Sequence, residues 1–503
     1  MATRWQTVCS LALGVAASAI LAAAQQPLIQ RSAPKLQGDH WVEQIHCRIP
    51  VKPGGRLTLR ANPGGVEVRP GDSGHVECLI HLTAYSPDPQ AAKACLDHYQ
   101  LKVLQTAGGA LIEGRSACGG DSGSTNATFA VSVPLKFNLD VKTQGGSVRV
   151  EKLDGQLRAE SAGGDIRTGN VLGPVWVSTA GGMIFLGNVG NSVQARTAGG
   201  NIQVGNVNGP ATITTGGGEI LAGVVNGPMT AQTAGGDIVL QAASGPVEVE
   251  TEGGQIHLGE CGNSVHAQTA AGNIQVGGAR GGVRAQTTGG SITLLKAMSS
   301  VLAETSAGRI LAQIDANRST FGPSRLETQV GDVDVFIPPT LPVTIDAVIS
   351  HTMGHRIISD FPLKVDRVKN NFMFGQEWAR GPLKGGGSHL DIRTVMGNIQ
   401  IRKLDAASIA KLKASQQEFW KNWGQISRQR DETVRQMQGL QRVNEKQMVD
   451  LQKQFQDLSR QLTERAREQI ERQTLDAQKQ LQELNRQLTE RAREQVDYTG
   501  GEQ

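Results

Sequence analysis

The chain has 503 residues, of which 62 are glycine, and only 4% are aromatic. Its 50 Lys and Arg residues nearly balance its 46 Asp and Glu residues, so the formal net charge at pH 7 is +4. A charge this close to zero produces no long-range attraction for a polyanion, and we therefore expect no nucleic-acid partner.

The first residues have the pattern of an export signal. Arg4 gives a positively charged start, residues 8–21 form an apolar run rich in Ala and Leu, and Ala22-Ala23-Ala24 fits a cleavage site. We predict that residues 1–24 are a signal peptide cleaved after Ala24, and that the protein is exported to a bacterial periplasm or cell surface. An uncleaved anchor is the alternative, although the run is short for a span of about 20 residues.

Residues 40–142 are expected to form a β-rich N-terminal cap with one helix. Apolar and polar residues alternate at 56–60 and 66–69, on either side of a Pro-Gly-Gly turn signal, and this pattern predicts strands. Residues 88–103 have apolar residues at helical spacing, which predicts a helix.

Four cysteines lie in this predicted cap: Cys47, Cys78, Cys95 and Cys118. They can form two disulfides in an oxidising compartment, and the sequence allows three pairings. Cys261 stands alone further along the chain, and we expect it to be a small apolar residue of the core.

Residues 143–312 repeat every 18 residues. In each repeat a hydroxyl residue is followed three positions later by the last glycine of a Gly-Gly or Ala-Gly pair, and two positions after that by Val or Ile. The hydroxyl column reads Thr143, Ser161, Thr179, Thr197, Thr215, Thr233, Thr251, Thr269, Thr287 and Thr305. A fixed period near 20 residues predicts a stacked solenoid.

Each repeat contains two short runs in which apolar and polar residues alternate, and this alternation predicts half-buried strands. One repeat, which we call a rung, is therefore expected to be strand, turn, strand, turn. Ten rungs pairing in parallel at about 4.8 Å would form an all-β parallel solenoid roughly 50 Å long.

Two columns of the repeat are expected to lie in turns. The hydroxyl column is predicted to satisfy backbone groups in or beside a turn. The middle of the repeat has Gly, Asn or Ser, from Gly155 to Ser299, and the exchange of Gly with Asn predicts a residue with left-handed φ.

Residues 313–404 lose the period, and we expect them to form irregular rungs and a C-terminal cap. Residues 326–338 (LETQVGDVDVFIP) and 390–401 (LDIRTVMGNIQI), with shorter segments at 345–347 and 359–362, resemble the end of a bacterial adhesin-like domain family. That family is similar to the head-GIN β-solenoids. The resemblance covers about residues 50–402. It implies a solenoid fold and brings no catalytic residues, and the biochemical role of the family is largely undefined.

Residues 405–497 are rich in Gln, Arg, Glu, Lys and Leu and are predicted to form a long helix, about 140 Å if unbroken. Residues 458–470 recur almost unchanged at 484–496, and the offset of 26 residues fits a coiled-coil-like bundle that is straight or slightly right-handed. The candidate oligomerisation residues are Phe455, Leu458, Leu462, Ile470, Leu481, Leu484, Leu488 and Val496. We expect self-association or binding of a partner helix. A single charged helix, or one folded back on the solenoid, is the alternative.

No segment has a strong catalytic, cofactor or metal pattern. Residues 71–74 and 120–123 (both GDSG) resemble the nucleophile loop of serine proteases but have no recognisable His and Asp framework. The column that follows the Gly-Gly pairs is too mixed to bind calcium at every rung. His351 and His355 have no third metal ligand. We therefore predict a protein that is not an enzyme and has no cofactor.

The outer faces of the rungs are rich in Thr, Gln, Asn and Ser, which suit polar contacts with a glycan or an envelope protein. Glu248, Glu250 and Glu252 are expected on one outward, solvated face. The sequence favours an exported, non-catalytic, adhesin-like binding and scaffolding module that is oligomerised or docked through its tail. The alternatives are a carbohydrate-active β-helix enzyme with a site in the loops of 321–390, and an envelope-signalling accessory protein.

Overall fold

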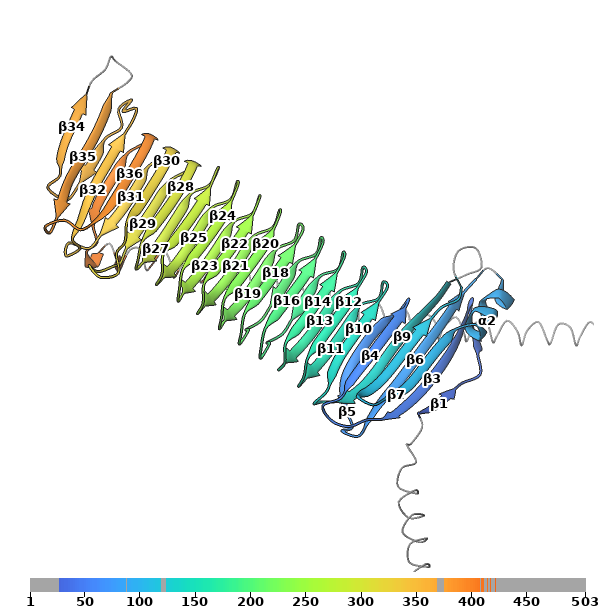
Figure 1. Ribbon diagram of the computed structural model, residues 1–503. Coiled ribbons are helices and arrows are strands. Elements are labelled where there is room, and N and C mark those ends of the chain that lie inside the picture. The colour runs from blue at the N-terminus through green and yellow to red at the C-terminus, as the bar shows by residue number, and fades with distance from the viewer. Residues whose placement is uncertain are drawn as a thin grey trace, which may run out of the picture. The chain divides into compact units, whose positions relative to one another are not determined.

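A computed structural model describes residues 27–86, 88–118, 124–368 and 375–407, together with 409, 410, 414, 417 and 421 (Figure 1). The chain divides into two compact units, and the second, Leu36–Asp39 with Lys421–Gln503, is largely outside this range. The predicted signal peptide lies outside the described residues, as does nearly all of the predicted helical tail, so both stay predictions. Within the described ranges no helix is long and apolar enough to cross a membrane.

The 18-residue period appears in the structure as parallel strand pairing. Val148 pairs with Ile166, and Val175 with Val193, so each residue lies beside its counterpart in the next repeat. The parallel solenoid that the repeat predicts is therefore confirmed. The strands form two sheets, called sheet A and sheet B, and the successive rungs can be followed along Figure 1.

The regular rungs alternate between the two sheets. Their sheet B strands are β10 (Asn138–Thr143), β12 (Leu157–Ser161), β14 (Val175–Thr179), β16 (Val193–Thr197), β18 (Ala211–Thr215), β20 (Met229–Thr233), β22 (Val247–Thr251), β24 (Val265–Thr269), β26 (Val283–Thr287) and β28 (Val301–Ala307). Their sheet A strands are β11 (Val148–Leu153), β13 (Ile166–Val171), β15 (Ile184–Leu186), β17 (Ile202–Val204), β19 (Ile220–Val225), β21 (Ile238–Ala243), β23 (Ile256–Cys261), β25 (Ile274–Ala279), β27 (Ile292–Ala297) and β29 (Ile310–Ile314).

The hydroxyl column binds consecutive rungs together. The Thr233 hydroxyl donates to the carbonyl oxygen of Gly218 in the preceding rung (2.8 Å) and accepts the N–H of Gly236 in its own rung (3.4 Å). The same donation recurs from Thr143 to Thr305, and these side chains are buried. The predicted role of this column in satisfying backbone groups is confirmed.

The glycine columns follow from the close stacking of the turns. A Cβ atom placed at Gly236 would lie 2.1 Å from the carbonyl oxygen of Gly218, so no larger residue fits. The left-handed φ predicted for the mid-repeat column is wrong, because no residue of this column, which lies wholly in the described range, has a positive φ. Space is limited at several of its glycines, since a Cβ at Gly155 would lie 1.9 Å from the Phe137 carbonyl oxygen, whereas the turns of other rungs accommodate Asn191, Asn263 and Ser299.

The region predicted as the N-terminal cap also contributes rungs. Its elements are β1 (Leu28–Arg31), β2 (Lys35–Gln37), β3 (His40–Pro50), β4 (Arg56–Asn62), β5 (Gly65–Gly71), β6 (His75–Tyr85), α2 (Pro89–Asp97), β7 (Gln100–Thr106), β8 (Gly109–Arg115) and β9 (Ser124–Pro134). β4 and β5 pair in parallel with β10 and β11 on one side, and with β8 and β9 on the other. Antiparallel strands then close this end. In sheet B, β7 pairs with β8. In sheet A, β6 pairs with β9, β3 pairs with β6, and β1 pairs with β3.

Helix α2 is shorter than the predicted helix at 88–103. It begins after Asp88, whose carboxylate accepts the N–H of Gln90 (2.9 Å), and it ends at Asp97. The helix prediction is wrong from residue 100, where pairing with β8 takes the chain into β7. The described residues contain the disulfides Cys47–Cys78 and Cys95–Cys118, which is one of the three pairings open to the sequence. Cys261 is buried and reduced, and burial raises its pKa to about 12.

The C-terminal rungs stack out of chain order. Their strands are β30 (Ser324–Val330), β31 (Val333–Ile337), β32 (Val343–Ile349), β33 (Ile357–Ser359), β34 (Lys364–Val368), β35 (Gln376–Leu383), β36 (Ser388–Met396) and β37 (Ile399–Lys403). The last two, β36 and β37, insert between β30 and β31 on one side and β32 and β33 on the other. β35 and β34 then continue sheet B as antiparallel strands, so antiparallel pairing ends the stack here too.

Candidate functional site

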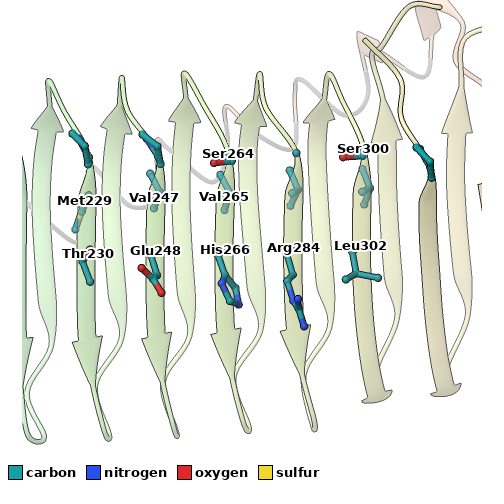
Figure 2. A pocket seen from close by; sticks show the side chains of 16 residues that line it. Met229, Thr230, Val247, Glu248, Ser264, Val265, His266, Arg284, Ser300 and Leu302 are labelled. Atoms are coloured by element: carbon teal, nitrogen blue, oxygen red, sulfur yellow. The ribbon is translucent and has the colours of Figure 1, made fainter. Parts of the chain in front are cut away.

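A shallow groove of about 610 Å³ runs across sheet B, over the first residues of strands β20 to β28. Figure 2 shows one outward side chain from each of these five successive strands: Thr230, Glu248, His266, Arg284 and Leu302. They occupy the same position in each repeat, and register pairing holds each beside the next. The groove is thus a periodic surface with one chemical group per rung.

The backbone of the groove floor is already hydrogen-bonded. The N–H of Met229 donates to the carbonyl oxygen of Pro246, and the N–H of Val247 donates to that of Ser264, each at 2.9 Å. The same bond recurs in the next two rungs. A ligand in the groove therefore has to be recognised by side chains, because an additional strand finds no free backbone edge on this described part of sheet B.

The middle of the groove brings three different polar groups together on adjacent rungs. Glu248 is an exposed hydrogen-bond acceptor and Arg284 an exposed cationic donor, while half-buried His266 lies between them. The Nε2 atom of His266 is buried and has no hydrogen-bond partner in the described part of the chain. Stacked strands lie about 4.8 Å apart, so the three groups are presented at a regular interval.

The same outward column continues toward the N-terminal rungs as a second hollow of about 240 Å³. Register pairing places Arg158, Trp176, Gln194 and Thr212 in line with Thr230. The guanidinium of Arg158 lies over the half-buried indole of Trp176, 4.1 Å from the ring centroid. This end of the column therefore offers an aromatic surface, a cation and an amide.

The sequence did not single out these groove residues, although it predicted the outward position of Glu248 and Glu250, which β22 confirms. Glu252 follows the end of β22 and is exposed. Glu250 accepts a 3.4 Å hydrogen bond from Gln232 on the neighbouring rung. The groove was missed because its side chains come from an outward position of the repeat, where the residue type changes from rung to rung. The repeat is most regular at its inward positions.

Two carboxylates of the column that follows the Gly-Gly pairs have structural roles. Asp165 and Asp237 accept the backbone N–H of the residue 18 positions later, at 2.8 and 2.7 Å. His351 and His355 lie in the connection between β32 and β33. No cluster of three or more His, Cys, Asp or Glu side chains suited to a metal ion occurs among the described residues.

Residues 321–390, expected as the loops of an alternative enzyme site, are largely strands, and three of their carboxylates are engaged by arginines. The pairs are Asp346 with Arg380, Asp360 with Arg402, and the buried Glu377 with Arg367. Of the two Gly-Asp-Ser-Gly loops, 120–123 lies outside the described residues. In the other, Asp72 binds His75 at 2.9 Å, and this hydrogen bond lowers the pKa of Asp72. The candidate oligomerisation residues, Phe455 to Val496, also lie outside the described part of the chain.

Neither a protein-family model nor a curated protein matches this sequence. A solved structure described as a candidate cell adhesion protein from Clostridium sporogenes aligns at 10% identity over 74% of this chain and 100% of its own, with a TM-score of 0.13. A candidate adhesin from Bacteroides fragilis aligns at 10% identity over 72% and 97%, with a TM-score of 0.14. TM-scores this low support no conclusion about fold or function, so the adhesin-like family stays a resemblance.

Proposed function

We propose that this protein is an exported, adhesin-like binding module that holds an extended polymer along the sheet B groove and catalyses no reaction. The observation that carries the proposal is the periodicity of the groove, which presents one outward side chain on each of five successive rungs. A polymer with a similar repeat can contact each rung in turn, so that individually weak contacts combine into useful affinity.

A linear glycan is the polymer class that fits this surface best. The groove is open and shallow, and it offers both donors and acceptors, in Arg284 and Glu248. Trp176 in the same column adds an aromatic side chain that a sugar can contact on the side that Arg158 does not cover. An extended peptide that binds by strand addition is disfavoured, because the ladder already uses the backbone groups of the floor.

The groove proposal is tested on the mature protein with a panel of soluble linear glycans, by affinity electrophoresis followed by calorimetry. Arg284→Ala and Trp176→Ala should each weaken binding of the selected glycan. Arg196→Ala is the matched control, because Arg196 is an exposed arginine of sheet B that lines neither hollow. Equal affinity in Arg284→Ala and Arg196→Ala would contradict the proposal.

The same glycan panel also tests the enzyme alternative. Cleavage of a glycan that Asp346→Asn abolishes would indicate catalysis in the C-terminal loops rather than simple binding. Asp346 suits this test because it is partly exposed and lies on β32, within residues 321–390.

The scaffolding part of the proposal concerns residues 405–497, which we propose to self-associate or dock on a partner helix. Several rods joined through their tails would present several grooves to one polymer and raise its apparent affinity. Sedimentation of the mature protein with and without residues 405–503 tests this. An oligomer that becomes a monomer on truncation supports self-association, whereas two monomers contradict it and make a pull-down with the tail the next experiment.

A further inference from the structure

A separate hollow of about 830 Å³ lies at the N-terminal end of sheet B, among strands β7, β8, β4 and β10. Among the described residues, five cationic side chains line it, against one carboxylate, that of Glu113: the cations are Arg31, Arg60, Lys102, Arg115 and Lys142. It shares no lining residue with the groove of Figure 2 in the described ranges. An inference about this hollow is therefore independent of the proposed glycan groove.

Most of these cations are held in place by acidic partners, but Arg115 is not. Arg31 binds the buried Glu43 at 2.7 Å, and Arg60 binds Asp140 at 2.8 Å. Arg115 is exposed at the end of β8, and no carboxylate of the described residues binds it. Its guanidinium therefore carries a fixed positive charge that no carboxylate of the described residues neutralises.

A buried tyrosine borders the same hollow. Tyr99 is 3% exposed, and its hydroxyl has no hydrogen-bond partner among the described residues. The hydroxyl lies against Gly114, also part of the lining, where a Cβ atom would come within 2.2 Å of it. Burial raises the pKa of Tyr99, and the hydroxyl lies beside the buried ring of Phe129, on the inward side of β8. Arg115 lies on the outward side of the same strand, so Tyr99 closes the floor of the hollow from within and does not contact a ligand at Arg115.

We propose that this hollow binds the oxyanion group of an acidic sugar, with Arg115 as its forked donor. One guanidinium group can donate two parallel hydrogen bonds to two oxygens of a carboxylate, sulfate or phosphate. Such charge-assisted hydrogen bonds are stronger than hydrogen bonds between neutral groups. Gln100 and Gln144 add amide donors at the rim, where they can contact the sugar hydroxyls. Four of the five cations are paired with carboxylates, so the charge of Arg115 is the one that favours an anion over a neutral sugar of the same shape.

The test is calorimetric titration of the mature protein with glucuronate, glucose 6-sulfate, glucose 6-phosphate and glucose at low salt. At least one of the three anions should bind, and comparing them identifies the carboxylate, sulfate or phosphate as the preferred group. Glucose should not bind measurably, and added salt should weaken binding of the anion because exposed charges are screened.

The matched variants are Arg115→Gln and Arg149→Gln, since Arg149 is an exposed arginine of sheet A outside the hollow. Arg115→Gln should lower affinity for the preferred anion about tenfold or more, and Arg149→Gln should leave it unchanged. Tyr99→Phe removes only a hydroxyl on the inward side of β8, and it should also leave the affinity for the anion unchanged. Failure of all three anions to bind, equal affinity for glucose, or equal affinity in the two arginine variants would overturn the proposal.

Discussion

Gly217→Ala and Gly218→Ala add the same methyl group to neighbouring residues, and we predict opposite effects on stability. A Cβ atom at Gly218 would lie 2.1 Å from the carbonyl oxygen of Gly200 and 2.5 Å from its carbon, in the rung stacked below it. At Gly217 the same atom would have no other atom of the described residues within 4 Å. Only the position relative to the stack differs between the two variants.

The cost of Gly218→Ala follows from that overlap. A carbon–oxygen contact normally lies at about 3.3 Å, so the two rungs would have to separate locally by about 1.2 Å. The carbonyl oxygen of Gly200 also accepts a 2.8 Å hydrogen bond from Thr215, which that movement would break. Overpacking typically costs about 1–3 kcal/mol and a lost hydrogen bond about 1 kcal/mol, so we expect destabilisation of about 3 kcal/mol.

Gly217→Ala should be neutral or stabilise the protein by up to about 1 kcal/mol, because alanine has fewer unfolded conformations than glycine. Guanidinium unfolding followed by far-UV circular dichroism, on the mature forms of both variants and the parent, measures the difference. Equal stability of the two variants would refute the steric explanation of the glycine columns.

Three further predictions address the rung contacts, the cap and pH. Thr251→Val keeps the shape of a column residue but removes its two hydrogen bonds, and it should lower the free energy of unfolding by about 1–3 kcal/mol in the same assay. Replacing Cys95 and Cys118 by serine should cost about 3 kcal/mol, seen as a lower melting temperature. The hydrogen bonds from Arg60 lower the pKa of Asp140 in the folded protein. The stability that they contribute is therefore fully present above the unfolded-state pKa of about 4, and it is lost as the pH falls through the lower folded-state pKa. Asp140→Asn should therefore weaken the acid dependence of the melting temperature, and an unchanged acid profile would contradict this assignment.

The sequence predicts the regular rungs well because their register equals the repeat. Every position of the 18-residue period meets its own copy, so a column such as Thr143 to Thr305 can be recognised in the amino-acid sequence alone. The mid-repeat glycines show where such reasoning fails. Gly and Asn do share a tolerance for positive φ, but no residue of this column has one. The close approach of the turns at several of its glycines is a property of the folded stack, which the exchange of residue types did not reveal.

At both ends of the stack the strands pair out of chain order, and this order was not predictable from the 18-residue period. Residues 56–61 pair with residues 138–143, and no repeat of 18 connects them. A weak signal was present, since Gly64 stands two residues before Val66 as Gly146 does before Val148, but it was interpreted as a turn. The groove and the cationic hollow were missed for a related reason. Each combines outward side chains of several strands, and these residues carry no distinctive motif.

The most direct test of the central claim is the affinity of the glycan selected by the panel as a function of its chain length, measured by calorimetry on the mature protein. A periodic surface predicts affinity that rises with each added sugar until the chain spans the outward column from Trp176 to Leu302 and then levels off. Affinity that does not depend on length beyond one or two sugars would show a single local site and contradict a groove that follows the repeat.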